Sequence, residues 1–416
     1  MEKVKETLSD NGIRVISERI SHVKSFSLGF WVQTGSNFEG DDVSGISHFI
    51  EHMLFKGTKK RSARRIAEDI EAYGGYMNAF TSKEHTCYYG RGRAKYLRKT
   101  FDVFADMIQN PLFRDRDIAN EKGVILDELR DCNDNPDDMI FDKFEEVLFA
   151  GNPLGNSILG REESITSFNN EILHRYHSGH YFPSNMLISA SGNISHELLT
   201  ELASKLIIPK NVQPELQIIN PFEYKPEEVI LQKNIEQDYC ILGNVTSGNT
   251  DDKRYVKRLL SLVLGEGSAS RLYQTVRERM GMTYQINSFV QSYKDLASFG
   301  IYFSTNPRQT GKVLSTISKE LKKFNEKGIS EKELKKAKEY MKGSMLLSLE
   351  STSNRMIKLA NSYMNYKRLI PFEEVLKMID AVTVDEVNQL SKELLDESRF
   401  SKVYIKSNSK IINTAA

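Results

Sequence analysis

Two histidines and a glutamate occur within the five residues from His48 to His52, His-Phe-Ile-Glu-His, in which Glu51 is the acid. On a helix, residues four apart lie on the same face, so His48 and His52 can direct their imidazoles at one ion. Neutral imidazoles are common zinc ligands, and two of them leave positions for a carboxylate and a water molecule. The segment therefore predicts a metal site in which Glu51 is the general base toward that water.

A third ligand is expected on another helix, and the predicted helix from Asp115 to Asp131 offers Glu121 and Glu128. Seven residues make nearly two helical turns, so these carboxylates lie within about 20° of one face. They are also about 10.5 Å apart along the axis, which is too far for both to bind one ion comfortably. We expect one to be a ligand and the other to orient a ligand or the water. Geometry alone leaves open which is which.

The run from Gly45 to Thr58, Gly-Ile-Ser-His-Phe-Ile-Glu-His-Met-Leu-Phe-Lys-Gly-Thr, resembles the zinc helix of the pitrilysin and mitochondrial processing peptidase family. That family carries the inverted zincin motif His-x-x-Glu-His. Its third ligand is a glutamate about eighty residues beyond the first histidine, in a segment like Glu121 to Glu128. The resemblance implies a zinc metalloendopeptidase with one Zn²⁺ per subunit, held by His48, His52 and Glu128. Glu121 would then be the supporting carboxylate.

Residues Gly74 to Thr81, Gly-Gly-Tyr-Met-Asn-Ala-Phe-Thr, are similar to the edge strand that pairs with substrate backbone in this family. An unpaired strand edge can accept an extended peptide without reading much of its sequence. The resemblance implies that Asn78 and Ala79 bind substrate. The alternative is an ordinary internal strand that follows a Gly-Gly turn.

The segment from Arg277 to Tyr284, Arg-Glu-Arg-Met-Gly-Met-Thr-Tyr, resembles another family segment, in which an arginine and a tyrosine form a pair facing the zinc. The resemblance implies that Arg277 and Tyr284 are catalytic and hold the substrate carbonyl as negative charge develops on it. In relatives with paired subunits this segment comes from the other half of a clam-shell. Whether the pair acts within one chain or across a dimer stays open, and a surface arginine with a core tyrosine is the alternative.

The elements that must position these residues follow one order twice. In the first half we predict strands at 14–20 and 26–32, helices at 46–55 and 64–72, strands at 76–81 and 86–92, and helices at 94–109 and 115–131. In the second half we predict strands at 229–232 and 240–245, helices at 253–264 and 270–279, strands at 283–288 and 297–303, and helices at 308–325 and 331–349. This order predicts an α+β fold of two homologous domains, each a mostly antiparallel sheet with helices packed on one face.

The second half lacks the metal-binding residues of the first. Aligning the long helices places Ala337 opposite Glu121 and Ser344 opposite Glu128, and no His-x-x-Glu-His follows residue 226. Four prolines between Ile208 and Pro226 predict a linker. We therefore divide the chain into a catalytic zinc-binding domain at 1–207, a linker at 208–226, and a homologous domain at 227–416 that has no metal site and carries the Arg/Tyr segment.

Composition narrows the class of protein. The 416 residues include 57 basic and 56 acidic ones, so the formal charge of +1 gives no reason to expect nucleic acid or a membrane as partner. No stretch reaches the roughly 18 apolar residues of a membrane span, and the amino terminus lacks a secretory signal. Three cysteines without a Cys-x-x-Cys pair argue against a disulfide framework. We expect a cytoplasmic protein.

A second histidine group, His174, His177 and His180, competes as a metal site. No acidic partner is spaced with these residues, and Gly179 is expected to end their helix before His180. We interpret them as a surface or interface patch.

The favoured hypothesis is a zinc endopeptidase that hydrolyses peptides or unfolded segments in a clam-shell chamber formed by two subunits. A homodimer is preferred because one chain carries both kinds of segment, and a heterodimer with a degenerate partner is the alternative. The rival function is a non-catalytic scaffold or docking subunit. We disfavour it because such subunits usually lose a ligand, whereas this chain retains all three predicted ligands and the base.

Overall fold

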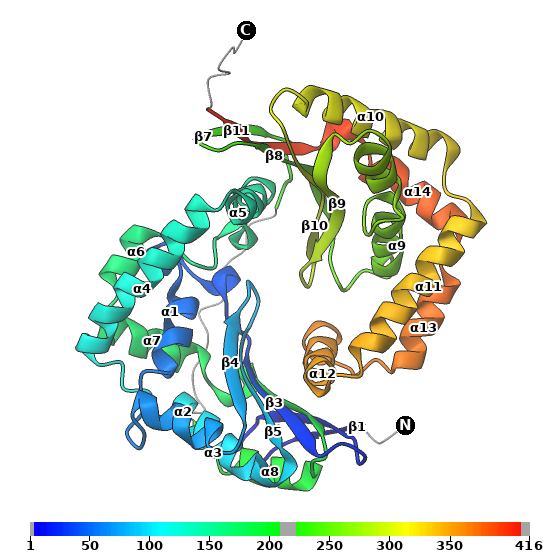
Figure 1. The fold of residues 1–416 in the computed structure, drawn as a ribbon. Coiled ribbons are helices and arrows are strands. Elements are labelled where there is room, and N and C mark those ends of the chain that lie inside the picture. The colour runs from blue at the N-terminus through cyan, green and yellow to red at the C-terminus, as the bar shows by residue number, and fades with distance from the viewer. Residues whose placement is uncertain (1–3, 209–221, 409–416) are drawn as a thin grey trace. The chain divides into compact units, whose positions relative to one another are not determined.

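The computed structural model describes residues 4–208 and 222–408. These residues form two compact units, neither of which is continuous in sequence. The first unit takes its described residues from Met1–Asp131, Asn156–Asn220 and Leu347–Leu369, and the second takes them from Cys132–Gly155, Pro221–Leu346 and Ile370–Ala416. Each unit contains one sheet with its own helices (Figure 1).

The described part of the first unit is built on a six-stranded sheet. Its strands are β1 (Val4–Leu8), β2 (Arg14–Arg19), β3 (Ser25–Val32), β4 (Tyr76–Thr81), β5 (Thr86–Arg93) and β6 (Met186–Gly192). They lie in the order β1-β2-β6-β3-β5-β4, and neighbours are antiparallel except for the parallel pair β2 and β6. Strand β4 is therefore an edge strand.

The helices of the first unit pack mainly on one face of this sheet. They are α1 (Ile46–Leu54), α2 (Ala63–Glu71), α3 (Leu97–Gln109), α4 (Asp115–Asp134, most of it in this unit), α6 (Glu162–Ser167), α7 (Asn170–His180), α8 (His196–Ser204) and α12 (Thr352–Tyr366). Alternate side chains of β3 are apolar on the sheet face that these helices cover, where Phe30 packs with Phe101 and Phe104 of α3. Trp31 lies on the opposite face and packs with Met356 of α12.

The described part of the second unit repeats the topology of the first. Its strands are β7 (Glu228–Lys233), β8 (Asp238–Ser247), β9 (Thr283–Ser292), β10 (Leu296–Thr305) and β11 (Ser401–Ser407). Their order is β7-β11-β8-β10-β9, and β7 with β11 is again the parallel pair. Strands β2-β6-β3-β5-β4 of the first unit have the same order and directions, so the predicted duplication is confirmed.

The helices of the second unit include one π-helical segment. The α-helices are α5 (Pro136–Leu148), α9 (Arg254–Leu264), α10 (Thr310–Lys327), α11 (Glu331–Ser348, most of it in this unit), α13 (Phe372–Ala381) and α14 (Val384–Leu394). The predicted helix at 270–279 is a π-helix over Tyr273–Arg279. π-Helical turns are rare and occur often at functional sites, so this departure from an α-helix bears on Arg277.

The units differ from the predicted contiguous domains because two helices pack with the sheet of the other half of the chain. Helix α5 packs against β8 and β11, where Ile140 and Phe144 join a core with Ile241. Helix α12 packs on β3 and β6 of the first unit (Figure 1). Each helix covers an apolar sheet face that would otherwise be exposed to water. This burial is the physical reason why α5 and α12 are exchanged between the two halves of the chain. Most of the predicted linker, 209–221, lies outside the described residues.

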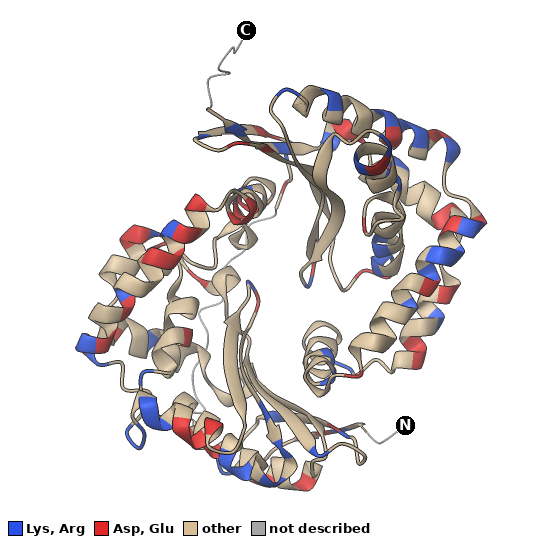
Figure 2. Ribbon diagram, in the orientation of Figure 1, with Lys and Arg blue, Asp and Glu red and all other residues tan. Residues whose placement is uncertain are grey.

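Charged residues lie mostly in the helices, and the strands contain fewer of them (Figure 2). On α4, which bears Glu121 and Glu128, acidic residues outnumber basic ones. Among the helices of the described ranges, none has both the length and the hydropathy that crossing a bilayer requires.

Candidate metal centre

Helix α1 carries the His-x-x-Glu-His motif, and its amino terminus is fixed by a buried carboxylate. Gly45 adopts the left-handed conformation with φ of 88°, and a Cβ there would lie 2.7 Å from the Leu159 carbonyl oxygen. Glu39 accepts hydrogen bonds from the backbone N–H groups of Gly45, at 2.6 Å, and Ser47, at 2.8 Å. These N–H groups have no partner within the helix, so Glu39 takes the place of a capping side chain.

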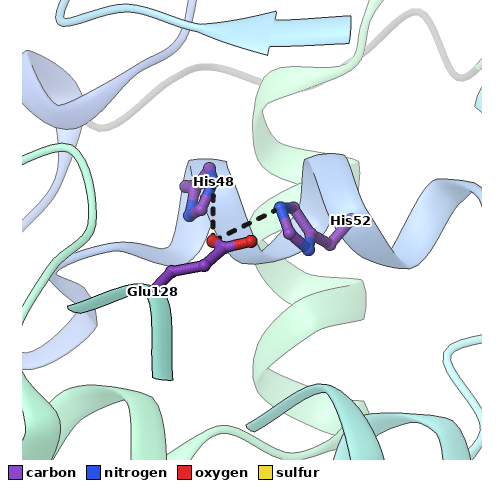
Figure 3. Close-up of side chains that lie close together, drawn as sticks. All are labelled: His48, His52 and Glu128. Carbon is purple, nitrogen blue, oxygen red and sulfur yellow. Dashed lines mark ion pairs between the residues drawn. The ribbon is translucent and has the colours of Figure 1, made fainter. Parts of the chain in front are cut away.

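The three predicted metal ligands converge. The Nε2 atoms of His48 and His52 each lie 3.8 Å from Oε2 of Glu128 (Figure 3). All three ligand atoms lie within 4.8 Å of one another, and this is the one cluster of metal-binding type in the described part of the chain. Both histidines come from α1, and the carboxylate comes from α4.

Glu121 lies behind His52 rather than beside the ligand atoms. Its Oε1 is 2.8 Å from His52 Nδ1, and its Oε2 is 2.5 Å from Lys56 Nζ. Helix geometry left open which of the two glutamates is the ligand. In the structure Glu128 approaches the two Nε2 atoms, whereas Glu121 contacts Nδ1 of the His52 ring. Burial raises the pKa of Glu121, but the hydrogen bonds from His52 and Lys56 outweigh burial and lower it overall.

The two imidazoles differ in their surroundings. Burial, together with the smaller effect of the neighbouring His52, lowers the pKa of His48 to about 4, so the ring is neutral at pH 7. Burial also lowers the pKa of His52, but the hydrogen bond with Glu121 and the nearby carboxylates raise it overall. A histidine must be neutral to bind a metal ion, and the His48 ring is already neutral at pH 7.

Glu51 is placed for proton transfer. Its side chain belongs to the buried face of α1, with 8% of the residue exposed. Thr81, the last residue of β4, donates its hydroxyl proton to Oε2 of Glu51 at 2.5 Å. Burial raises the pKa of Glu51, and the Thr81 hydrogen bond acts in the opposite direction. A raised pKa brings a carboxylate nearer to the range in which a general base works at neutral pH.

The donor set fits zinc. Two imidazole nitrogens and one carboxylate oxygen are the protein ligands of many catalytic zinc sites. Zinc bonds of about 2.1 Å in a tetrahedron separate ligand atoms by roughly 3.4 Å, so the observed 3.8 Å separations need only small side-chain shifts. Among the described residues, the buried Nδ1 of His48 has no hydrogen-bond partner, so this ring is held by packing and by whatever its Nε2 binds.

Asn78 and Ala79 lie on the edge strand β4, as the resemblance implies. The pairing of β4 with β5 places Asn78 opposite Tyr89 and Ala79 opposite Tyr88. The backbone N–H of Ala79 donates to the side-chain oxygen of Asn78 at 2.9 Å. This N–H is therefore engaged by a side chain instead of the β5 ladder, and it belongs to the outer edge of the sheet.

Arg277 and Tyr284 lie together in the second unit. The Arg277 guanidinium is 4.8 Å from the centre of the Tyr284 ring and 4.7 Å from that of Tyr273. Two aromatic faces hold this cation in place through its charge. Tyr284 is 75% exposed, so the alternative of a core tyrosine is wrong.

The second histidine group forms no metal cluster among the described residues. Helix α7 continues through Gly179 and ends at His180, because Gly179 occupies an ordinary helical position. His177 is partly buried and stacks on Tyr181, and His180 stacks on Tyr176. The stacked rings of His177 and His180 contribute to the packing around α7, and His174 is exposed, so the interpretation as a surface or interface patch stays a prediction.

Four residues near these sites were not singled out from the sequence: Glu39, Lys56, Thr81 and Tyr273. Lys56 is one helical turn beyond His52, and Tyr273 is one turn before Arg277, so spacing alone offered a signal for both. Alternation along β4 also puts Thr81 on the same sheet face as Ala79. Glu39 had no such signal, because its contact with α1 depends on the path of the intervening loop.

A helix with His-x-x-Glu-His and a carboxylate from a second helix, on a duplicated α+β scaffold, define an inverted-zincin type of metallopeptidase architecture. Comparison with family models agrees. The model described as insulinase (peptidase family M16) matches residues 14–162, and the model described as peptidase M16 inactive domain matches residues 167–341. The chain belongs to peptidase family M16.

Relatives of similar length match this chain in sequence. A protein of Bacillus subtilis called uncharacterized zinc protease YmxG is 35% identical over 95% of this chain and 96% of its own length. An uncharacterized zinc protease of Mycobacterium leprae is 34% identical over 94% of this chain and 89% of its own length.

Two solved structures have the same fold. A protease from Helicobacter pylori superposes with a TM-score of 0.90 at 22% identity, covering 98% of this chain and all of that one. A peptidase M16 inactive domain from Pseudomonas fluorescens also gives 0.90, at 20% identity, covering 97% of this chain and 98% of that one. The fold is thus shared by proteins whose names differ on activity, so activity must be argued from the site.

Proposed function

We propose that this protein is a zinc-dependent endopeptidase that hydrolyses peptides or unfolded segments. The observation that supports this most directly is the convergence of His48 and His52 with Glu128 Oε2, each at 3.8 Å, next to the buried carboxylate of Glu51. The names of the relatives in B. subtilis and M. leprae support zinc as the metal. Retention of all three ligands and the base speaks against a scaffold subunit.

Zinc held by His48, His52 and Glu128 would lower the pKa of a water molecule and polarise the scissile carbonyl. Glu51 takes the proton of the attacking water and returns it to the leaving amine. Glu121 holds the His52 ring through Nδ1, which leaves Nε2 as the atom that faces the metal position.

Substrate binds as an added strand at the edge of β4 in this proposal. The outward N–H of Ala79, which is held by the Asn78 side chain, would exchange that partner for a substrate carbonyl. Main-chain hydrogen bonds of this kind give affinity with little sequence preference. This suits an enzyme that acts on unfolded segments.

The proposal includes a chamber formed by two subunits, with Arg277 and Tyr284 contributed across a homodimer. Two donors aimed at the substrate carbonyl would stabilise the charge that develops on its oxygen. The Arg277 side chain is ordered for this task by the rings of Tyr273 and Tyr284. A cytoplasmic location fits the three free cysteines, because thiols stay reduced there.

Digestion of a peptide library by the purified protein, with zinc content measured on the same samples, tests the function. We expect cleavage that a chelator abolishes and added zinc restores. Glu51→Gln should retain zinc and lose about 10²–10⁴-fold in kcat, the usual contribution of a positioned acid–base group. A zinc-loaded wild type that cleaves no member of the library would favour the scaffold function.

A further inference from the structure

The hydrogen bond from Thr81 to Glu51 connects the edge strand to the base. The Thr81 hydroxyl lies 2.5 Å from Oε2 of Glu51, and thirty positions separate the two residues in sequence. In the described part of the chain, Thr81 is the hydrogen-bond donor to this carboxylate. The contact lies within the first unit, between β4 and α1.

The position of Thr81 follows from the pleat of β4. Thr81 lies opposite Thr86 of β5, and Ala79 lies opposite the buried Tyr88, so both point to the sheet face that packs on α1. Asn78 and Phe80 point to the other face, where Phe80 packs beside Trp31. A side chain from β4 can reach Glu51 only at an odd-numbered position, and Thr81 is the one that carries a hydroxyl.

This hydrogen bond also gives the two carboxylate oxygens of Glu51 different roles. Because Oε2 accepts the hydrogen bond from the Thr81 hydroxyl, Oε1 is the oxygen that is left to take a proton from water. A carboxylate on three rotatable bonds otherwise samples several orientations, and small errors of placement are costly in proton transfer. Hydrogen bonds to charged groups are stronger than those between neutral groups and so can hold one rotamer.

We infer that Thr81 is a positioning residue for the general base, and that it links Glu51 to the strand on which substrate binds. This inference rests on the proposed function. Two residues separate Thr81 from Asn78 along one short strand. A peptide that pairs with Ala79 therefore also restricts the movement of Thr81, which orients the base Glu51. The link is expected to act on the rate of the chemical step and little on substrate affinity.

The test compares Thr81→Val, which keeps the shape and loses the hydroxyl, with Thr81→Ser, which keeps the hydroxyl. With a fluorogenic peptide identified by the library digestion, we expect Thr81→Val to lose roughly tenfold to a hundredfold in kcat. KM should stay within about twofold, and zinc content should match the wild type. Thr81→Ser should recover most of kcat, because it retains the donor.

The matched control is Thr34→Val. Thr34 is buried in the same unit, and its hydroxyl bonds Tyr176 at 2.9 Å and not Glu51. The Thr34→Val variant should have a lower melting temperature than the wild type and nearly the same kcat. Melting temperature and zinc content of every variant show whether a loss in kcat comes from unfolding or loss of metal.

The outcomes separate the inference from the function. A Thr81→Val variant with wild-type kcat, beside an inactive Glu51→Gln, would overturn the inference and leave the proposed function standing. Equal losses in Thr81→Val and Thr81→Ser would also overturn it, because the hydroxyl would then not be the relevant group. A wild type without peptidase activity would overturn both. A loss of kcat in Thr81→Val with recovery in Thr81→Ser supports the inference.

Discussion

Glu121 holds His52 by a hydrogen bond of 2.8 Å between Oε1 and Nδ1, on the side of the ring away from the Nε2 that approaches Glu128. Only 2% of Glu121 is exposed, and Lys56 occupies its second oxygen. The carboxylate therefore has little freedom, and it fixes both the tautomer and the orientation of the imidazole.

Removing this carboxylate should weaken metal binding without removing a ligand. We predict that Glu121→Gln lowers zinc affinity about 10–100-fold, the usual effect of losing such an orienting partner. Competition with a chromophoric chelator measures the affinity directly. An unchanged affinity would mean that packing alone orients the His52 ring.

Glu128→Gln should have a larger effect on the same measurement. A carboxamide carries no charge and is a poor zinc ligand, so we predict a loss of more than about 100-fold in zinc affinity. The Glu128 side chain is 40% exposed, so the substitution leaves no deeply buried group without a partner. Melting temperature without metal should therefore stay near that of the wild type. A variant that still loads fully with zinc would shift the ligand assignment to Glu121.

The Glu39 carboxyl that caps α1 predicts a dependence of stability on pH. Burial raises the pKa of Glu39 from 4.5 to about 7, although hydrogen bonds from Ser47 and Gly45 oppose this. The folded state then binds the proton more tightly than the unfolded state does. The contribution of Glu39 to the free energy of unfolding is therefore fully present below about pH 4.5 and is lost as the pH rises to about 7. The contribution is up to about 3 kcal/mol.

Glu39→Gln removes this titration and isolates its effect. We predict that the free energy of unfolding of the wild type, minus that of the variant, falls between pH 4.5 and pH 7 and is constant above it. Denaturant unfolding of both proteins at each pH supplies the difference, and other titrating groups cancel. A flat difference, or one that rises with pH, would show that Glu39 stays ionised in the fold.

A mixing experiment locates the action of Arg277. Glu51→Gln and Arg277→Ala should each lose activity alone, the second by about 10²-fold, as for loss of a donor to the oxyanion. If Arg277 acts across a dimer, a mixed dimer contains one site with both Glu51 and the partner's arginine. We predict that mixing the inactive variants restores part of the activity. Activity equal to the average of the two variants would show that Arg277 serves its own chain.

Sequence alone was sufficient for the local features of the site. The spacing of His48, Glu51 and His52 requires a shared helix face, because α-helical geometry leaves no other arrangement of residues three and four apart. Ser330 and Glu333 cap α11 as their spacing indicates, and Thr383 with Glu386 form the capping box of α14. In β3, the apolar side chains at alternate positions, Phe26, Leu28, Phe30 and Val32, form the face that packs on the helices.

Tertiary structure decided which distant groups meet. Glu121 and Glu128 are equivalent on an isolated helix, and only the docking of α4 against α1 brings Glu128 to the imidazoles and Glu121 to Nδ1 of His52. The Thr81 bond to Glu51 and the exchange of α5 and α12 between the two halves also depend on how elements far apart in sequence pack. Helix and strand periods follow from local backbone geometry, whereas these contacts come from the burial of apolar faces, which no local pattern encodes.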